Sequence, residues 1–153
     1  MKRGIAKRRM SSLNSNFGMF VIYRKSLIMA LFPNGPDDAL QAAMEMLNEL
    51  ENLNLSRKER KYQPIRIGIG LHTGTLMLGT IGEEERMDGT VISDAVNLAS
   101  RIEGLTKELQ ATLLLSEETY KKLRNKKKYS FNKLGKVTVK GKSKSSQVYE
   151  VVS

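Results

Sequence analysis

The residues best suited to chemistry in this chain are an amide and a guanidinium, Asn97 and Arg101, four positions apart. Residues at this spacing share one face of an α-helix, so the two side chains would project together. A guanidinium binds carboxylate or phosphate through paired hydrogen bonds, and an amide both donates and accepts. The pair is therefore suited to an anionic or sugar-bearing ligand. The alternative is structural: Asn97 bridges backbone groups, and Arg101 pairs with Glu103 or Asp94 at the surface.

Residues that could bind a metal or act as nucleophiles are sparse. The chain has no cysteine and one histidine, His72, which excludes disulfides and multi-histidine zinc clusters. We expect His72 to make a hydrogen bond at a strand end. Asp37 and Asp38 are adjacent carboxylates, but they follow a Pro-Asn-Gly-Pro turn, where an acidic residue caps a helix. No metal site within this chain is therefore predicted.

The segment before Asn97 predicts a strand and a long hairpin. Ile65, Ile67 and Ile69 alternate with smaller or polar residues, as in a strand with one buried face. The opposite face carries two glycines, Gly68 and Gly70, which leave room for another element to pack closely. The apolar run 75–81, the acidic tip 83–85 and the short apolar run 90–92 then predict an antiparallel hairpin. The glycines lack the Gly-Lys-Ser/Thr ending of a phosphate-binding loop.

A helix is predicted directly after this hairpin. Ser93 or Asp94 would cap it, and Gly104 would end it. Its apolar face is formed by Val96, Leu98, Ala99 and Ile102.

Outside this region the pattern predicts alternating strands and helices. We expect a strand over 27–32, a helix from Asp37 or Asp38 to about Leu53, and a strand over 111–115. Ser116 followed by two glutamates predicts the start of another helix. Strands over 137–139 and 147–151 would close the sheet.

Three stretches carry a specific resemblance. IGIGLHTG, GTIG and RMDGTVISDAVNLASRIEGLTK resemble the C-terminal half of a class III nucleotide cyclase domain, the adenylate and guanylate cyclase family. Residues 134–152 are similar to the closing strands of that family, and residues 27–50 to the strand and helix that follow its second metal-binding aspartate. The resemblance implies an α+β, ferredoxin-like domain over 27–153, truncated at its N-terminus, after a non-matching basic segment over 1–26.

The resemblance also implies a reaction and a set of roles. In the family, two domains pair head to tail, and a purine nucleoside triphosphate becomes a 3',5'-cyclic nucleotide plus pyrophosphate. Asn97 and Arg101 match the ribose-orienting asparagine and the transition-state arginine. Thr90 matches the purine-reading position and weakly favours ATP over GTP. Lys140 matches the lysine at the terminal phosphates, with Lys142 as the fallback.

The resemblance implies that the metal aspartates of the family have no counterpart here. The family's lysine, glycine and second aspartate fall at Ile22, Lys25 and Ser26, and no acidic residue precedes Asp37. Mg would then be held only by a partner domain in a homo- or heterodimer, and the chain alone would be inactive. A frameshift in the upstream DNA would account for the segment 1–26. Loss of the first strand and helix would expose part of the sheet.

Composition fits one cytoplasmic domain and leaves two other functions open. The chain has 153 residues, 40% of them hydrophobic, and a formal net charge of +10 gathered toward both ends. No run approaches the ~20 apolar residues of a membrane span. Nucleic acid is not the expected partner, because no aromatic-rich platform accompanies the lysines. The alternatives are a non-catalytic dimerisation or regulatory relic of a cyclase and a basic nucleic-acid-binding protein, which salt-dependent retention on DNA or RNA would reveal.

Overall fold

The computed structural model describes residues 16–24, 26–75, 89–138 and 145–152. In these ranges one mixed sheet has the strand order β2-β1-β3-β4-β6-β5. Its strands are β1 (Asn16–Arg24), β2 (Ser26–Phe32), β3 (Gly68–Thr75), β4 (Leu113–Ser116), β5 (Ser130–Thr138) and β6 (Ser145–Val152). The helices are α1 (Pro36–Glu59), α2 (Gly89–Glu108), α3 (Glu117–Lys122) and the short 3-10 helix η1 (Lys126–Lys128).

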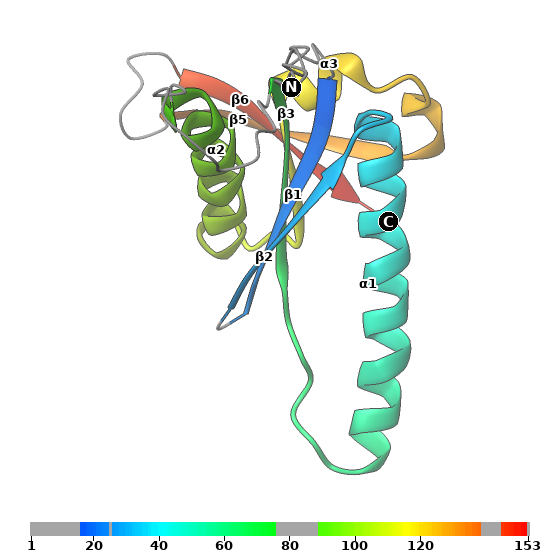
Figure 1. Ribbon diagram of the computed structural model, residues 1–153. Coiled ribbons are helices and arrows are strands. Elements are labelled where there is room, and N and C mark those ends of the chain that lie inside the picture. The colour runs from blue at the N-terminus through cyan, green and yellow to red at the C-terminus, as the bar shows by residue number, and fades with distance from the viewer. Residues whose placement is uncertain (1–15, 25, 76–88, 139–144, 153) are drawn as a thin grey trace, which may run out of the picture.

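Helices cover both faces of the sheet, with α1 and α2 on opposite sides (Figure 1). This arrangement follows from the alternation along β4, because Leu113 and Leu115 pack in the α1 cluster whereas Leu114 packs in the α2 cluster. Burial on both faces explains why β4 is a continuous apolar run. The two clusters hold α1 and α2 in place on either side of the central strands.

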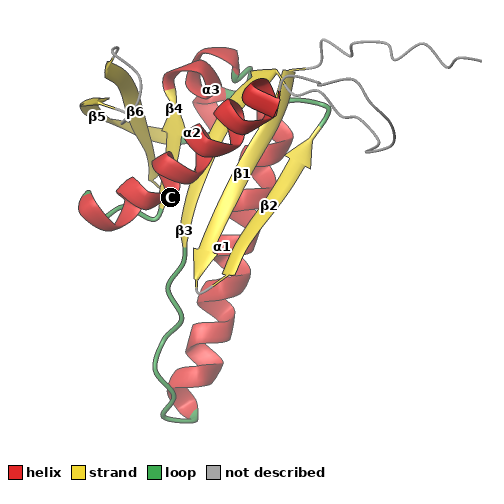
Figure 2. Cartoon of the chain, turned by 60° about the vertical axis from the view of Figure 1, so that its left-hand side comes forward, coloured by secondary structure: helices red, strands yellow, loops and turns green. Residues whose placement is uncertain are grey.

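Strand β1 lies inside the sheet, between β2 and β3. It pairs antiparallel with both neighbours, with Val21 opposite Met29 of β2 and opposite Gly70 of β3. From the sequence alone we expected no strand in this segment. Residues 16–24 therefore contribute a central strand, and the outer edge on this side is formed by β2 (Figure 2).

Two predicted boundaries in the region of α2 are wrong. The run 90–92 was predicted as a hairpin strand, but the helix already begins at Gly89. The β-branched residues there favour a strand by propensity, but tertiary context overrides such local preferences. Gly104 was predicted to end the helix, which continues to Glu108 because the following turn also buries Thr106.

Helix α1 differs from its prediction at both ends. It runs to Glu59 rather than Leu53, since the added residues are mostly good helix formers. At its start the N-cap is Gly35, with no side-chain cap, so capping by Asp37 or Asp38 is wrong. Asp37 instead accepts hydrogen bonds from the backbone N–H groups of Arg124 and Asn125, each at 3.1 Å. The carboxylate thus ties α1 to the segment after α3.

The predicted cap of α3 at Ser116 is confirmed. Its Oγ accepts from the backbone N–H of Thr119 at 3.1 Å and lies 3.0 Å from His72 Nδ1. Thr119 Oγ1 in turn lies 2.9 Å from Ser116 Oγ and donates to the Leu71 carbonyl at 3.3 Å. His72 is buried and makes a hydrogen bond as predicted, but it lies inside β3 rather than at a strand end. The network joins β3 to the start of α3.

Replacing Ser116 by alanine should therefore lower the free energy of unfolding by about 1–2 kcal/mol. The substitution removes the helix cap and leaves buried partners without their hydrogen bond. Urea unfolding followed by circular dichroism measures the change. Ser56→Ala, at an exposed position of α1, is the control and should stay within about 0.5 kcal/mol of the parent. Equal stability of the two variants would contradict this role for Ser116.

Among the helices in the described ranges, none combines the length and apolarity required to cross a bilayer.

Candidate functional site

The predicted pair Asn97 and Arg101 lies on the exposed side of α2. Both residues are exposed, as are Gly104 and Glu108, so these positions form one solvent-facing stripe along the helix. The opposite side of α2 is buried against the sheet by residues that include Leu98. The structure therefore brings the amide and the guanidinium to the same surface, one turn apart.

The orientation of α2 is fixed by two glycines of β3. At Gly70 an added Cβ would lie 2.6 Å from the Ala99 carbonyl oxygen and 2.9 Å from the Cα of Glu103. At Gly68 an added Cβ would lie 2.9 Å from Glu103 Oε1. The prediction that another element lies close to this glycine face is confirmed, and that element is α2. We call this close contact between α2 and the glycine face of β3 the α2–β3 seam. Backbone contact there leaves α2 little freedom to rotate, which keeps Arg101 directed away from the sheet.

Glu103 places a carboxyl group inside this seam. The residue is 5% exposed, and its Oε1 has no hydrogen-bond partner among the described residues. Burial raises the pKa of this carboxyl, and the nearby positive charge of Lys107 opposes the shift. From the sequence, Glu103 was considered only as a surface partner for Arg101, and its burial overturns that alternative. The helical spacing from Ala99 and Ile102 could have indicated that it faces the sheet.

The raised pKa of Glu103 predicts a specific pH dependence of stability. The folded state binds this proton more tightly than the unfolded state, so stability declines as the pH rises from the ordinary pKa of 4.5 through the folded pKa. Glu103→Gln cannot ionise and escapes this decline. The melting temperature of the variant minus that of the parent should therefore increase across this window. Thermal unfolding of both proteins in matched buffers measures it, and a difference that does not change with pH would refute the prediction.

Comparison with known proteins decides the family. A family model described as the adenylate and guanylate cyclase catalytic domain matches residues 32–152. The chain belongs to this cyclase family.

Individual relatives agree with the family assignment. An adenylate cyclase of Anabaena cylindrica is 42% identical over 135 residues, which cover 84% of this chain and 27% of that protein. The terminal-differentiation specific adenylate cyclase of Dictyostelium discoideum is 33% identical over 92% of this chain and 7% of its own length. This cyclase domain thus spans a minor part of both relatives.

Solved structures show the same fold. A bacterial light-regulated adenylyl cyclase superposes with a TM-score of 0.63 and 26% identity, covering 88% of this chain and 39% of that chain. The adenylyl cyclase CyaB from P. aeruginosa gives a TM-score of 0.63 at 22% identity over 89% of this chain and 72% of that chain. The predicted α+β cyclase fold is confirmed.

Of the other two predicted substrate residues, the structure describes the position of Thr90 but not that of Lys140. Thr90 lies in the first turn of α2. Lys140 and its fallback Lys142 lie outside the described residues, as does the hairpin segment 76–88. The structure therefore brings Asn97 and Arg101 together and does not relate either to Lys140. The substrate roles of Thr90 and Lys140 remain predictions.

The carboxylates of the cyclase domain do not suit a magnesium site, as far as the structure describes them. Magnesium binds hard oxygen ligands, mostly carboxylates. No group of three or more metal-ligating side chains occurs in the described part of the chain. Strand β1 carries no acidic residue, and Asp37 accepts hydrogen bonds from the backbone beyond α3. The described residues offer no ligand set for the ion.

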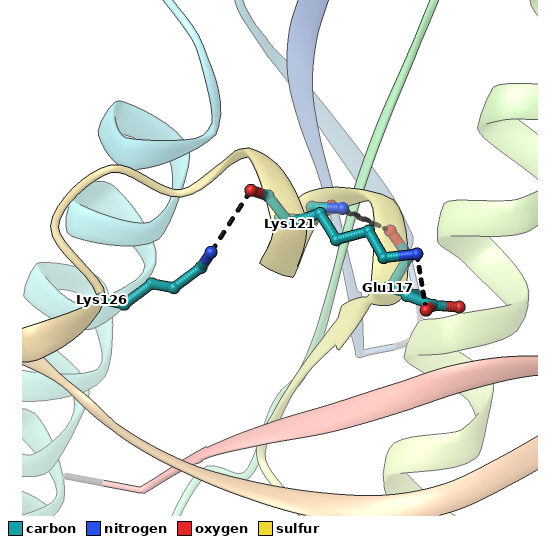
Figure 3. Close-up of polar contacts among 5 residues, drawn as sticks. Glu117, Lys121 and Lys126 are labelled. Atoms are coloured by element: carbon teal, nitrogen blue, oxygen red, sulfur yellow. Dashed lines mark hydrogen bonds and ion pairs between the residues drawn. The ribbon is translucent and has the colours of Figure 1, made fainter.

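Basic side chains after β4 make local contacts. The Nζ of Lys121 lies 2.7 Å from Glu117 Oε1, and the Nζ of Lys126 donates to the Lys121 carbonyl at 3.3 Å (Figure 3). The hydrogen bond between Glu117 and Lys121 lowers the pKa of Glu117 and raises the pKa of Lys121. The Lys126 ammonium also lies 4.9 Å from the centre of the Tyr120 ring. These contacts support a structural role for Lys121 and Lys126.

Proposed function

We propose that this chain supplies the asparagine and arginine half of a composite nucleotide cyclase site. The other half, which carries the metal aspartates, belongs to a second cyclase domain paired head to tail with this one. The observation that carries the proposal is the exposed pair Asn97 and Arg101 on α2, in a chain of the cyclase family. The substrate is a purine nucleoside triphosphate, with ATP weakly favoured.

Each residue of the pair has a distinct role. Asn97 hydrogen-bonds the ribose and orients its 3'-hydroxyl toward the α-phosphate. Arg101 stabilises the negative charge that develops on the α-phosphate as pyrophosphate leaves, which is how positioned guanidinium groups act in phosphoryl transfer. Thr90 contacts the purine, and Lys140 contacts the terminal phosphates. The close packing of α2 on β3 supports the proposal. It fixes the helix that carries Arg101, and charge stabilisation requires donors that are already in place.

Only the partner domain would supply the carboxylates that hold magnesium at this site. The ion neutralises phosphate charge when bound, and no carboxylate of β1 is available to hold it here. We therefore propose that the isolated chain is inactive and that a homodimer of it is inactive too. A heterodimer in which the partner carries both aspartates would form one active site.

Mixing two deficient chains tests this function. The partner is a cyclase domain that retains both metal aspartates but has its transition-state arginine replaced by alanine. Neither chain alone should form cyclic AMP from ATP and magnesium, whereas the mixture should. Activity no higher than the sum of the separate chains would refute complementation, and then a non-catalytic relic of a cyclase would be the better account. GTP assayed in parallel tests the preference for ATP.

A further inference from the structure

The structure contains a large cavity at the C-terminal end of α2, apart from the Asn97 and Arg101 surface. Its volume is about 990 Å³, at the upper end of the range for small-molecule sites. The walls come from α1, from the segment entering β3, and from the connection between α2 and β4. Asn97 and Arg101 do not line it. The cavity is therefore separate from the proposed nucleotide site.

The lining combines an aliphatic surface with cations. Four aliphatic side chains, each partly buried, form the apolar part: Leu50, Ile65, Ile67 and Ala111. Two exposed cations, Arg66 and Lys107, lie among them, and no described lining residue is acidic. An apolar surface with cations at its exposed side fits a molecule that has an apolar body and a negatively charged group.

Hydrogen bonds hold the walls of this cavity in place. The Asn54 side chain donates to the Ile65 carbonyl at 2.8 Å and accepts from the Ile65 N–H at 2.7 Å. On the other side, the Ala111 N–H donates to the Thr106 carbonyl at 2.9 Å. Small-molecule sites are usually formed before the ligand arrives, which lowers the entropy lost on binding. The cavity meets this condition.

We propose that this cavity binds an amphipathic organic anion, such as a medium-chain carboxylate. Its apolar body lies against the four aliphatic side chains, and its acidic group lies at Arg66 and Lys107. Apolar burial supplies the affinity, and the two cations select the charge of the head group. The site does not depend on cyclase activity, so it is tested by binding alone.

Matched probes of one chain length test the head-group preference. Octanoate and octylammonium, each below its micelle concentration, and octanol, below its solubility limit, are titrated into the ¹⁵N-labelled full chain. Octanoate should shift the amide resonances of the cavity residues saturably. Octanol should bind on the order of tenfold more weakly, the loss of one charge-assisted contact, and octylammonium more weakly still. Octylammonium binding as tight as octanoate, or no saturable shift at these residues, would overturn the proposal.

Variants separate the roles of the two parts of the lining. Arg66→Gln combined with Lys107→Gln should abolish the preference for octanoate over octanol while octanol still binds. Ala111→Phe should occupy part of the apolar surface of the cavity and weaken all three probes. The control pair Arg60→Gln with Lys122→Gln removes two exposed cations elsewhere and should keep the preference. An unchanged preference in the Arg66 and Lys107 variant would contradict the proposal. If a variant fails to fold, the three-probe comparison on the parent protein still decides.

Discussion

Arg101→Ala should lower cyclic AMP formation in the mixed-chain assay by on the order of 10²–10³. This is the loss found when one donor that stabilises transition-state charge is removed, and the guanidinium of Arg101 is the group proposed for that role. Because Arg101 is exposed on α2, its removal should leave the melting temperature nearly unchanged. The initial rate of cyclic AMP formation, measured with the partner in excess, gives the factor directly.

The matched control for this variant is Arg60→Ala. Arg60 is also an exposed arginine, but it lies at the C-terminal end of α1. Its replacement should leave the rate within about twofold, since it removes the same charge from the chain without touching the proposed site. Equal losses in both variants would mean that net charge, rather than the position of Arg101, drives the effect. Asn97→Ala should lower the rate as well, because the ribose would lose its orienting group.

Gly70→Ala should be the most damaging small substitution within the described sheet. Its added Cβ would lie 2.6 Å from the Ala99 carbonyl oxygen and 2.9 Å from Glu103 Cα, both on the α2 backbone. Backbone atoms cannot rotate away as a flexible side chain can, so the helix must shift. We expect a loss of roughly 3 kcal/mol in the free energy of unfolding, the upper part of the range for overpacking. The melting temperature should fall by on the order of 10 °C.

The same substitution at Gly104 provides the control. No atom lies within 4 Å of a Cβ added there, and the residue is in the interior of α2. Gly104→Ala should therefore raise the free energy of unfolding by about 0.5–1 kcal/mol, because alanine restricts the unfolded chain and favours helix. Thermal unfolding of the two variants side by side tests whether α2 packs closely on β3 at Gly70. If Gly70→Ala were as well tolerated as Gly104→Ala, the close packing of α2 on β3 would be refuted.

The sequence predicted the parts of this fold that local pattern controls. The alternation of Ile65, Ile67 and Ile69 indicated a strand here, although β3 begins only at Gly68 and continues to Thr75. The start of α3 followed from Ser116, and the shared face of Asn97 and Arg101 from their spacing. It did not predict that residues 16–24 would lie between β2 and β3, since this pairing depends on contacts distant in the chain. Nor did local pattern show that Gly104 continues a helix, because packing of the next turn overrides its low propensity.

The candidate site was predictable only where spacing carries the information. Two residues four apart on a helix define a common face whatever surrounds them, so Asn97 and Arg101 could be paired from the sequence. The burial of Glu103 and the cavity beside Arg66 depend on how α2 meets β3 and the segment before it. These features arise from tertiary packing and could not be read from one segment.

We propose that Asn97 and Arg101 face a nucleotide held by another polypeptide. The direct test is paramagnetic broadening in the ¹⁵N-labelled chain, mixed with the aspartate-bearing partner, manganese(II) and a non-cyclisable ATP analogue. We expect signals of α2 around Asn97 and Arg101 to broaden only when partner, metal and nucleotide are all present. Sharp signals there in the complete mixture, or broadening that needs no partner, would contradict it.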